Sequence, residues 1–80
     1  MYKRIRELRE DKDIKQSVIA KYLNMSQNGY SQYETGKNDI PTKTLIDLSI
    51  FHNVSIDYIL GLTDVQKPYP RKKWCAKLHL

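Results

Sequence analysis

The sequence predicts an all-α fold, a small domain of five helices followed by a short basic tail. Apolar residues in the first 62 positions recur at helical spacing, and residues that favour helix ends separate the groups. No credible strand pattern or internal repeat interrupts them. The chain has 80 residues, fewer than the ~100–200 of an ordinary domain, so its core must be compact and local.

The first two predicted helices are short and amphipathic. Ile5 and Leu8 recur at helical spacing over residues 2–12, with mixed charges on the other face. Asp13 and Gln16 have the spacing of a capping box, which makes Asp13 a candidate N-cap for the second helix. Four residues form the apolar face and the end of that helix: Val18, Ile19, Tyr22 and Leu23.

A sharp turn and a third helix follow. Asn24 tolerates a positive φ better than most residues, and Met25 can fill the corner. Ser26 is a good N-cap for a helix that runs to about Thr35, with Gly36 as the residue that ends it. This helix turns Tyr30 and Tyr33 inward. Its outer face is polar and uncharged, and consists of Gln27, Asn28, Ser31, Gln32 and Thr35.

Two more helices complete the predicted domain. Thr42 is a candidate N-cap for the fourth helix, and Asn53 is expected to end it. Its inner face is Leu45, Leu48 and Phe51. Ser55 can cap a short fifth helix that stops at Gly61.

The net charge of +5 lies entirely in the tail. Residues 1–64 contain nine basic and nine acidic residues, whereas residues 65–80 contain five basic residues and no acid. We therefore place a domain boundary after residue 64. The tail is either a solvated end or a phosphate-binding arm, and the spacing of Trp74 and Leu78 suits a helix as well as a strand.

Composition excludes several functional classes. The start of the chain lacks the apolar region of a signal peptide, and no apolar run approaches the ~18 residues of a membrane span, so we expect a cytoplasmic protein without membrane contact. A single cysteine cannot form an internal disulfide, and Cys75 with His79 would supply only two metal ligands. No catalytic constellation is present, so we expect neither an enzyme nor a cofactor.

A short helix, a tight turn and a second helix with an amide-rich outer face together describe a helix-turn-helix. Gln27 and Asn28 lie at the start of the third helix, where such helices enter the major groove. Glutamine and asparagine can pair with the N6 and N7 atoms of adenine. Double-stranded DNA is therefore the expected partner.

Residues 16–37 resemble the helix-turn-helix of the Cro/phage-repressor (XRE) family. The resemblance extends over residues 3–63 and includes Glu34-x-Gly36-Lys37, Pro41 and the segment 53–60. It implies a compact, lambda-repressor-like DNA-binding domain.

The resemblance also implies roles for individual residues. Gln16 corresponds to a glutamine that bonds a DNA phosphate and braces the first residue of the recognition helix, residues 27–35. The implied base contacts are Gln27, Asn28 and Gln32, with Ser26 and Ser31 nearby. The implied phosphate contacts are Gln16, Lys15, Thr35, Lys37 and Asn38. Arg9 and Glu34 match an ion pair between the first and third helices.

Four residues depart from the family pattern. Asn24 replaces the usual turn glycine, and Lys15 replaces the usual Thr or Ser cap. Gly29 within a helix costs ~1 kcal/mol relative to alanine unless it permits close approach to DNA. Asp39 brings a negative charge to a loop expected to face phosphate.

The function expected is that of a sequence-specific transcription regulator, a repressor that binds a palindromic operator as a homodimer. Ile59, Leu60, Leu62 and the tail are the expected dimer surface. Two alternatives remain at this point: an antitoxin-like protein-interaction module that uses the tail, and an RNA-binding use of the same fold.

Overall fold

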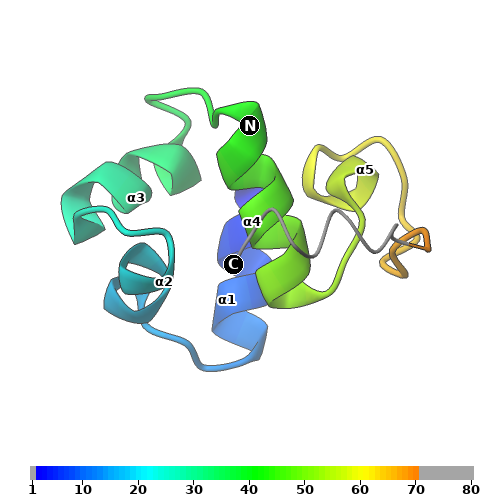
Figure 1. The fold of residues 1–80 in the computed structure, drawn as a ribbon, viewed down its shortest axis with the longest axis horizontal. Helices are drawn as coiled ribbons and strands as arrows, with labels where there is room; N and C mark the ends of the chain where they lie inside the picture. The colour runs from blue at the N-terminus through cyan, green and yellow to red at the C-terminus, as the bar shows by residue number, and fades with distance from the viewer. Residues whose placement is uncertain (1, 71–80) are drawn as a thin grey trace.

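The computed structural model describes residues 2–70, and this part of the chain contains five α-helices and no strand, which confirms the all-α class. The helices are α1 (Lys3–Asp11), α2 (Gln16–Tyr22), α3 (Gln27–Thr35), α4 (Thr42–His52) and α5 (Ile56–Ile59). Figure 1 shows α1 and α4 in the middle, with α2 and α3 on one side and α5 on the other. Predictions about Trp74, Cys75, Leu78 and His79 lie outside the described residues.

One apolar core joins all five helices. Its largest fully buried side chains are Ile5, Ile19, Tyr30, Leu48 and Ile59. The expected inward position of Tyr30 is confirmed, and Tyr33 packs against the core while partly buried. Leu48 is fully buried, with Leu45 and Phe51 beside it, as the spacing on α4 predicts.

Most of the predicted helix ends are confirmed. The Ser26 hydroxyl accepts a hydrogen bond from the Gly29 amide at 3.0 Å, and the Ser55 hydroxyl accepts one from the Tyr58 amide at the same distance. Gly36 ends α3 with φ 78° and Asn53 ends α4 with φ 54°. Each of these signals acts through a hydrogen bond or a dihedral angle within a few residues of the helix end.

Two predicted N-caps are wrong. Asp13 has φ 55° and reverses the chain after α1, and α2 begins only at Gln16, with extended Lys15 as its N-cap and no side-chain cap bond. Thr42 is the first residue of α4 rather than its cap. The cap position belongs to Pro41, whose carbonyl accepts from the Leu45 amide at 3.0 Å.

The predicted inner face of α2 and the predicted dimer surface also need correction. Val18 is 51% and Tyr22 45% exposed, so these two residues of the predicted face lie outside the core. Ile19 is fully buried and Leu23 packs against the core, as predicted, and the small Ala20 is buried as well where α2 packs against α3. Tyr22 covers the ring of Phe51, with 4.8 Å between the centroids. Ile59 is 1% exposed in the core and so is unavailable to a partner.

His52 is a buried polar residue at the end of α4. It is 3% exposed, and neither ring nitrogen has a hydrogen-bond partner within residues 2–70. Burial, together with the nearby charge of Lys12, lowers the pKa of His52 to about 4. The ring is therefore neutral at pH 7 and meets Phe51 edge-on at 5.0 Å.

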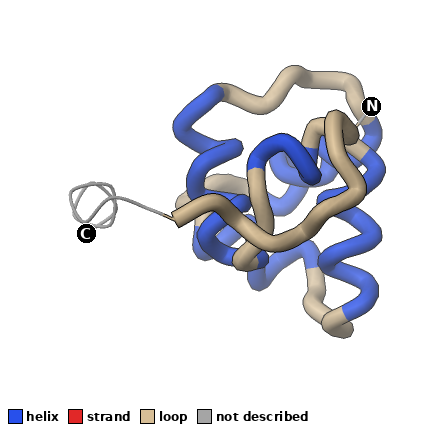
Figure 2. The backbone as a smooth tube through the Cα atoms, turned by 90° about the vertical axis from the view of Figure 1, so that its right-hand side faces the viewer, coloured by secondary structure: helices blue, strands red, loops and turns tan. Residues whose placement is uncertain are grey.

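Arg4 connects α1 to the segment after α5. Its guanidinium donates to the carbonyl oxygens of Tyr58 and Thr63 and to the Asp64 carboxylate, and it stacks 4.2 Å above the Tyr58 ring. The Ser55 amide donates to the Gln66 carbonyl at 3.0 Å, which holds the loop that Figure 2 shows after α5.

No helix within residues 2–70 is long and apolar enough to cross a membrane.

Candidate nucleic-acid interface

The candidate interface begins with the turn between α2 and α3. Asn24 adopts φ 59°, as expected for the residue that replaces a turn glycine, and the Met25 amide donates to the Ala20 carbonyl at 2.9 Å. A Cβ at Gly29 would lie 3.1 Å from both Met25 Cε and Ser26 Oγ. The glycine therefore gives room to the residues of the turn, which is a local reason for its presence in α3.

The start of α3 and the start of α2 meet at the surface. Gln16, Gln27, Asn28 and Ser31 line an open, shallow hollow between the two helices. All four side chains are polar and uncharged, and they come from the two elements that the sequence predicts to face DNA. Such a surface offers both donors and acceptors to a ligand.

The side chain of Glu34 contacts this surface from below through Gln16 and is 3% exposed. Its two oxygens accept hydrogen bonds from Arg9 Nε at 2.7 Å and Arg9 Nη2 at 3.1 Å, so the structure contains the ion pair expected between α1 and α3. Arg9 Nη1 also donates to the Ile14 carbonyl at 3.0 Å. The pair ties α3 to α1 and to the loop before α2.

The environment of Glu34 keeps it ionised. Burial alone raises its pKa, but the hydrogen bond from Arg9, the adjacent Tyr30 hydroxyl and the hydrogen bond from Gln16 outweigh burial and hold the pKa below its ordinary value. Burial and the Glu34 carboxylate raise the pKa of Tyr30. Near neutral pH, Glu34 is thus a buried anion that can only accept hydrogen bonds.

Three amide contacts extend from this region. The resemblance implied that Gln16 braces Gln27, whereas the contacts of Gln16 with Glu34 and of Gln32 with Asn38 were not predicted. Gln16 Nε2 donates to Glu34 Oε1 at 3.0 Å, and Gln27 Nε2 lies 3.5 Å from Gln16 Oε1. Asn38 Nδ2 donates to Gln32 Oε1 at 2.5 Å. No spacing rule predicts the pairing of Gln16 with Glu34 or of Gln32 with Asn38, because each pair joins side chains from different elements.

The remaining predicted residues lie around the same surface. Lys15 and Lys37 are both exposed; Lys15 directly precedes α2, and Lys37 lies in the loop after α3. The Thr35 hydroxyl donates to the Gln32 carbonyl at 3.2 Å. The Ser26 hydroxyl oxygen accepts the N-cap hydrogen bond, and its hydroxyl proton stays available to donate to another partner.

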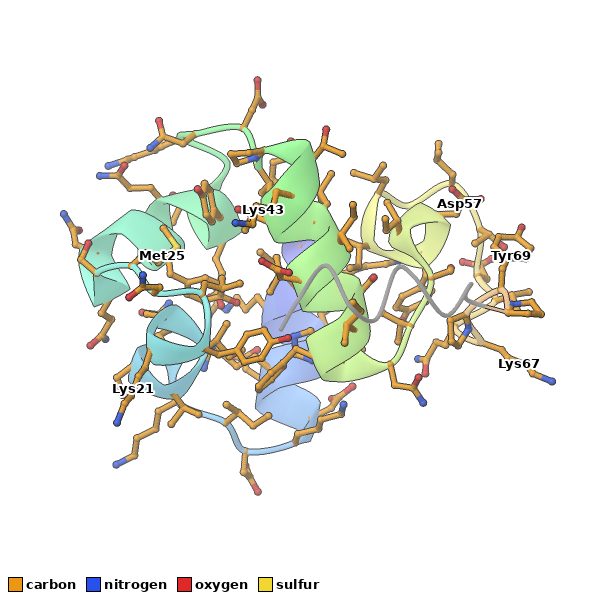
Figure 3. The ribbon with its side chains drawn as sticks, viewed as in Figure 1. Lys21, Met25, Lys43, Asp57, Lys67 and Tyr69 are labelled. Carbon is orange, nitrogen blue, oxygen red and sulfur yellow. The ribbon has the colours of Figure 1, made fainter. Side chains whose placement is uncertain are left out.

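Charge is distributed unevenly across the domain. Residues 15–38 contain three lysines and one acid, whereas residues 39–64 contain one lysine and four acids. Figure 3 shows Lys21 on the side of α2 and Asp57 on α5 at the opposite end. The surface that carries the amides is therefore the more positive one, which favours an anionic ligand.

A family model described as helix-turn-helix matches residues 5–59. The chain belongs to the Cro/C1-type (XRE) helix-turn-helix family. This assignment confirms the resemblance seen in residues 16–37, and α2 and α3 are the two helices of the helix-turn-helix.

Among family relatives, the HTH-type transcriptional regulator ImmR of Bacillus subtilis is 42% identical over 65 residues, which are 81% of this chain and 51% of that protein. The regulator YobD of the same organism is 33% identical over 88% of this chain and 62% of its own length. The ImmF control region 10 kDa protein of Bacillus phage phi105 is 36% identical over 78% of this chain and 68% of its own. The chain thus spans about half to two thirds of the relatives it matches. No solved structure matches it significantly.

Proposed function

We propose that this protein is a sequence-specific regulator of transcription that binds double-stranded DNA by placing the N-terminal half of α3 in the major groove. The observation that carries the proposal is the open hollow of uncharged polar side chains formed by Gln16, Gln27, Asn28 and Ser31. A solvated helix face does not require amides at these positions, whereas base edges are read by such groups. Relatives described as transcriptional regulators support the same conclusion.

The roles of the side chains follow from their positions. Base contacts are assigned to Gln27, Asn28 and Gln32, with Ser26 and Ser31 beside them. Phosphate contacts are assigned to Gln16, Lys15, Thr35, Lys37 and Asn38. The amides determine which sequence is bound, while the lysines add attraction that is independent of sequence and sensitive to salt.

Repression is the proposed mode of regulation. A domain bound across a promoter excludes polymerase from the same DNA and needs no further contact surface to do so. Activation would require an additional surface that recruits polymerase. Transcription in vitro from a promoter that overlaps the bound site tests the mode, and an increase in transcript would contradict repression.

A homodimer on a palindromic operator is the proposed assembly. One short helix contacts only a few base pairs, and two copies on half-sites about 34 Å apart multiply the specificity. Apolar side chains are exposed after α5, where Leu62 is 73%, Val65 62% and Tyr69 72% exposed. Leu60, at 39%, lies beside them, and this group replaces Ile59 in the expected dimer surface.

Selection of bound sequences from a random duplex pool tests the function. We expect an enriched motif with two inverted half-sites, and sedimentation of the protein with that DNA should give two chains per duplex. An enriched motif without inverted symmetry would contradict the dimer. Absence of any enriched sequence would contradict sequence-specific binding and favour the protein-interaction alternative.

A further inference from the structure

Gln32 in α3 and Asn38 in the following loop contact each other at two points. Gly36 adopts φ 78° at the end of α3 and reverses the chain, which brings the loop back alongside the helix. The Asn38 backbone amide donates to the Gln32 carbonyl at 3.4 Å, and Asn38 Nδ2 donates to Gln32 Oε1 at 2.5 Å. The Lys37 amide donates to the same carbonyl at 3.0 Å. Because these backbone bonds fix where Asn38 lies, its short side chain reaches Gln32 with little loss of rotamer freedom.

This contact sets Gln32 apart from the other glutamine on α3 that is assigned to base reading. Gln27 lines the hollow between α2 and α3, whereas Gln32 is not one of the residues that line it. Gln32 is half-buried and Asn38 is exposed. A loop residue, and not a residue of α2, therefore determines where the Gln32 side chain lies.

The amide of Asn38 can serve a second partner in the same orientation. Its NH₂ group has two protons, and the bond to Gln32 Oε1 uses one of them. The oxygens of a DNA phosphate only accept hydrogen bonds, so Asn38 can contact a phosphate only through this NH₂ group. The orientation that a phosphate requires is thus the one that the structure has toward Gln32.

We propose that Asn38 is a positioning residue for base recognition: its NH₂ group bonds a DNA phosphate with one proton and holds Gln32 Oε1 with the other. The contact with the DNA backbone and the reading of a base pair by Gln32 are then coupled. An Asn38 that contacted only phosphate would add the same affinity to every sequence. This inference rests on the proposed function and gives a loop residue a part in its specificity.

Restraint of Gln32 increases discrimination between bases because a free side chain behaves differently with right and wrong bases. A free glutamine must be ordered when it pairs with the right base, which weakens that complex. Next to a wrong base it can turn away into solvent and avoid the mismatch. Asn38 opposes both effects. One neutral hydrogen bond corresponds to about 2- to 12-fold in an equilibrium constant, so we expect changes of this size.

The test uses the full 80-residue chain and the sequence enriched from a random duplex pool. Gln32→Ala and Gln27→Ala first identify the base pair that each residue reads, as the position where preference is lost. Dissociation constants are then measured for duplexes with each of the four bases at both positions. Asn38→Ala should reduce the discrimination at the Gln32 position by at least threefold and leave that at the Gln27 position within twofold.

Lys37→Ala is the matched control, because Lys37 is the adjacent exposed residue of the same loop and is also assigned to phosphate. It should weaken binding to every duplex and leave both discriminations within twofold. Asn38 is exposed and its φ is not positive, so alanine fits the backbone there. If circular dichroism shows Asn38→Ala unfolded, Asn38→Asp serves instead: it keeps the shape of the side chain, has no proton for either partner, and should also reduce the preference for the original base by at least threefold.

A second measurement changes the DNA and leaves the protein intact. Methylphosphonate replaces one phosphate at a time, and the phosphate that Asn38 contacts is the one whose replacement weakens the wild type but not the Asn38 variant. Replacing that phosphate should reduce the wild-type discrimination at the Gln32 position by at least twofold. The same replacement should leave the discrimination at the Gln27 position unchanged.

Several results would overturn the inference. These are a reduction below threefold in the Asn38 variant, an equal reduction at the Gln27 position, an equal reduction in Lys37→Ala, or no phosphate whose replacement affects the Gln32 position. A Gln32→Ala variant that keeps its preference at every base pair would overturn it as well. A pool without any enriched sequence would instead overturn the proposed function on which the inference rests.

Discussion

Replacement of Arg9 by methionine would leave the Glu34 carboxylate buried without its cation. The two side chains are 14% and 3% exposed and share hydrogen bonds of 2.7 and 3.1 Å. Removing one partner of a buried pair costs about 3–5 kcal/mol. Since Glu34 keeps its bond from Gln16, we expect the lower end, about 3 kcal/mol. A domain of 80 residues has about 4–12 kcal/mol of stability, so the variant should lose about a quarter to three quarters of its free energy of unfolding.

Urea unfolding at pH 7, followed by circular dichroism, measures this loss. The matched control is Arg6→Met, because Arg6 also pairs with a glutamate, Glu10, but at 3.4 Å and with both side chains more than half exposed. That change should cost less than about 0.5 kcal/mol. Equal losses in the two variants would refute the reasoning about burial.

The pH dependence provides a further check on Glu34. Its pKa in the folded state lies below the ordinary value, so the ion pair contributes stability above the glutamate pKa of about 4.3 in the unfolded chain. That contribution is lost as the pH falls through the folded-state pKa. The difference between wild type and Arg9→Met should therefore shrink in acid, and a constant difference down to pH 2 would contradict the assignment.

Three other measurements address specificity, the buried histidine and the turn. Gln27→Ala should lose about 1–3 kcal/mol of binding at one base pair, whereas Lys37→Ala should weaken specific and random duplexes alike and reduce the salt slope by about one unit. Equal losses on both kinds of DNA for Gln27→Ala would exclude base reading. The pKa of His52 is about 4 in the folded chain and about 6.5 in the unfolded chain, so the contribution of the neutral ring to stability is fully present above pH 6.5 and is progressively lost as the pH falls toward 4. Plots of melting temperature against pH for wild type and His52→Phe should therefore diverge between pH 6.5 and 4. Parallel plots would contradict a neutral buried ring. At Asn24, where φ is 59°, a change to glycine should leave the free energy of unfolding nearly unchanged, whereas a change to alanine should lower it by about 1 kcal/mol. Urea unfolding measures both variants. An alanine variant more stable than wild type would contradict the role of the left-handed turn.

The helix ends show which sequence signals are reliable here. Ser26, Ser55, Gly36 and Asn53 act through bonds or dihedral angles within a few residues, and the structure has each of them as predicted. Asp13 carries an equally good local signal, yet its φ of 55° places it in the turn after α1. The capping pattern allowed two starts for α2, and only the packed chain distinguishes them.

The sequence by itself determined the all-α class, the helix-turn-helix and the amide-rich face of α3, because periodicity, caps and residue type are local properties. Only the tertiary structure decided which residues of the predicted apolar face of α2 are buried, since Ile19 lies in the core while Val18 and Tyr22, which have the same core spacing, are exposed. It also buries the small Ala20, where α2 packs against α3. It also brought Glu34 to Gln16, 18 positions away in the chain. Long side chains have many rotamers, so their partners are chosen by the packing of the helices that carry them and not by spacing in the sequence.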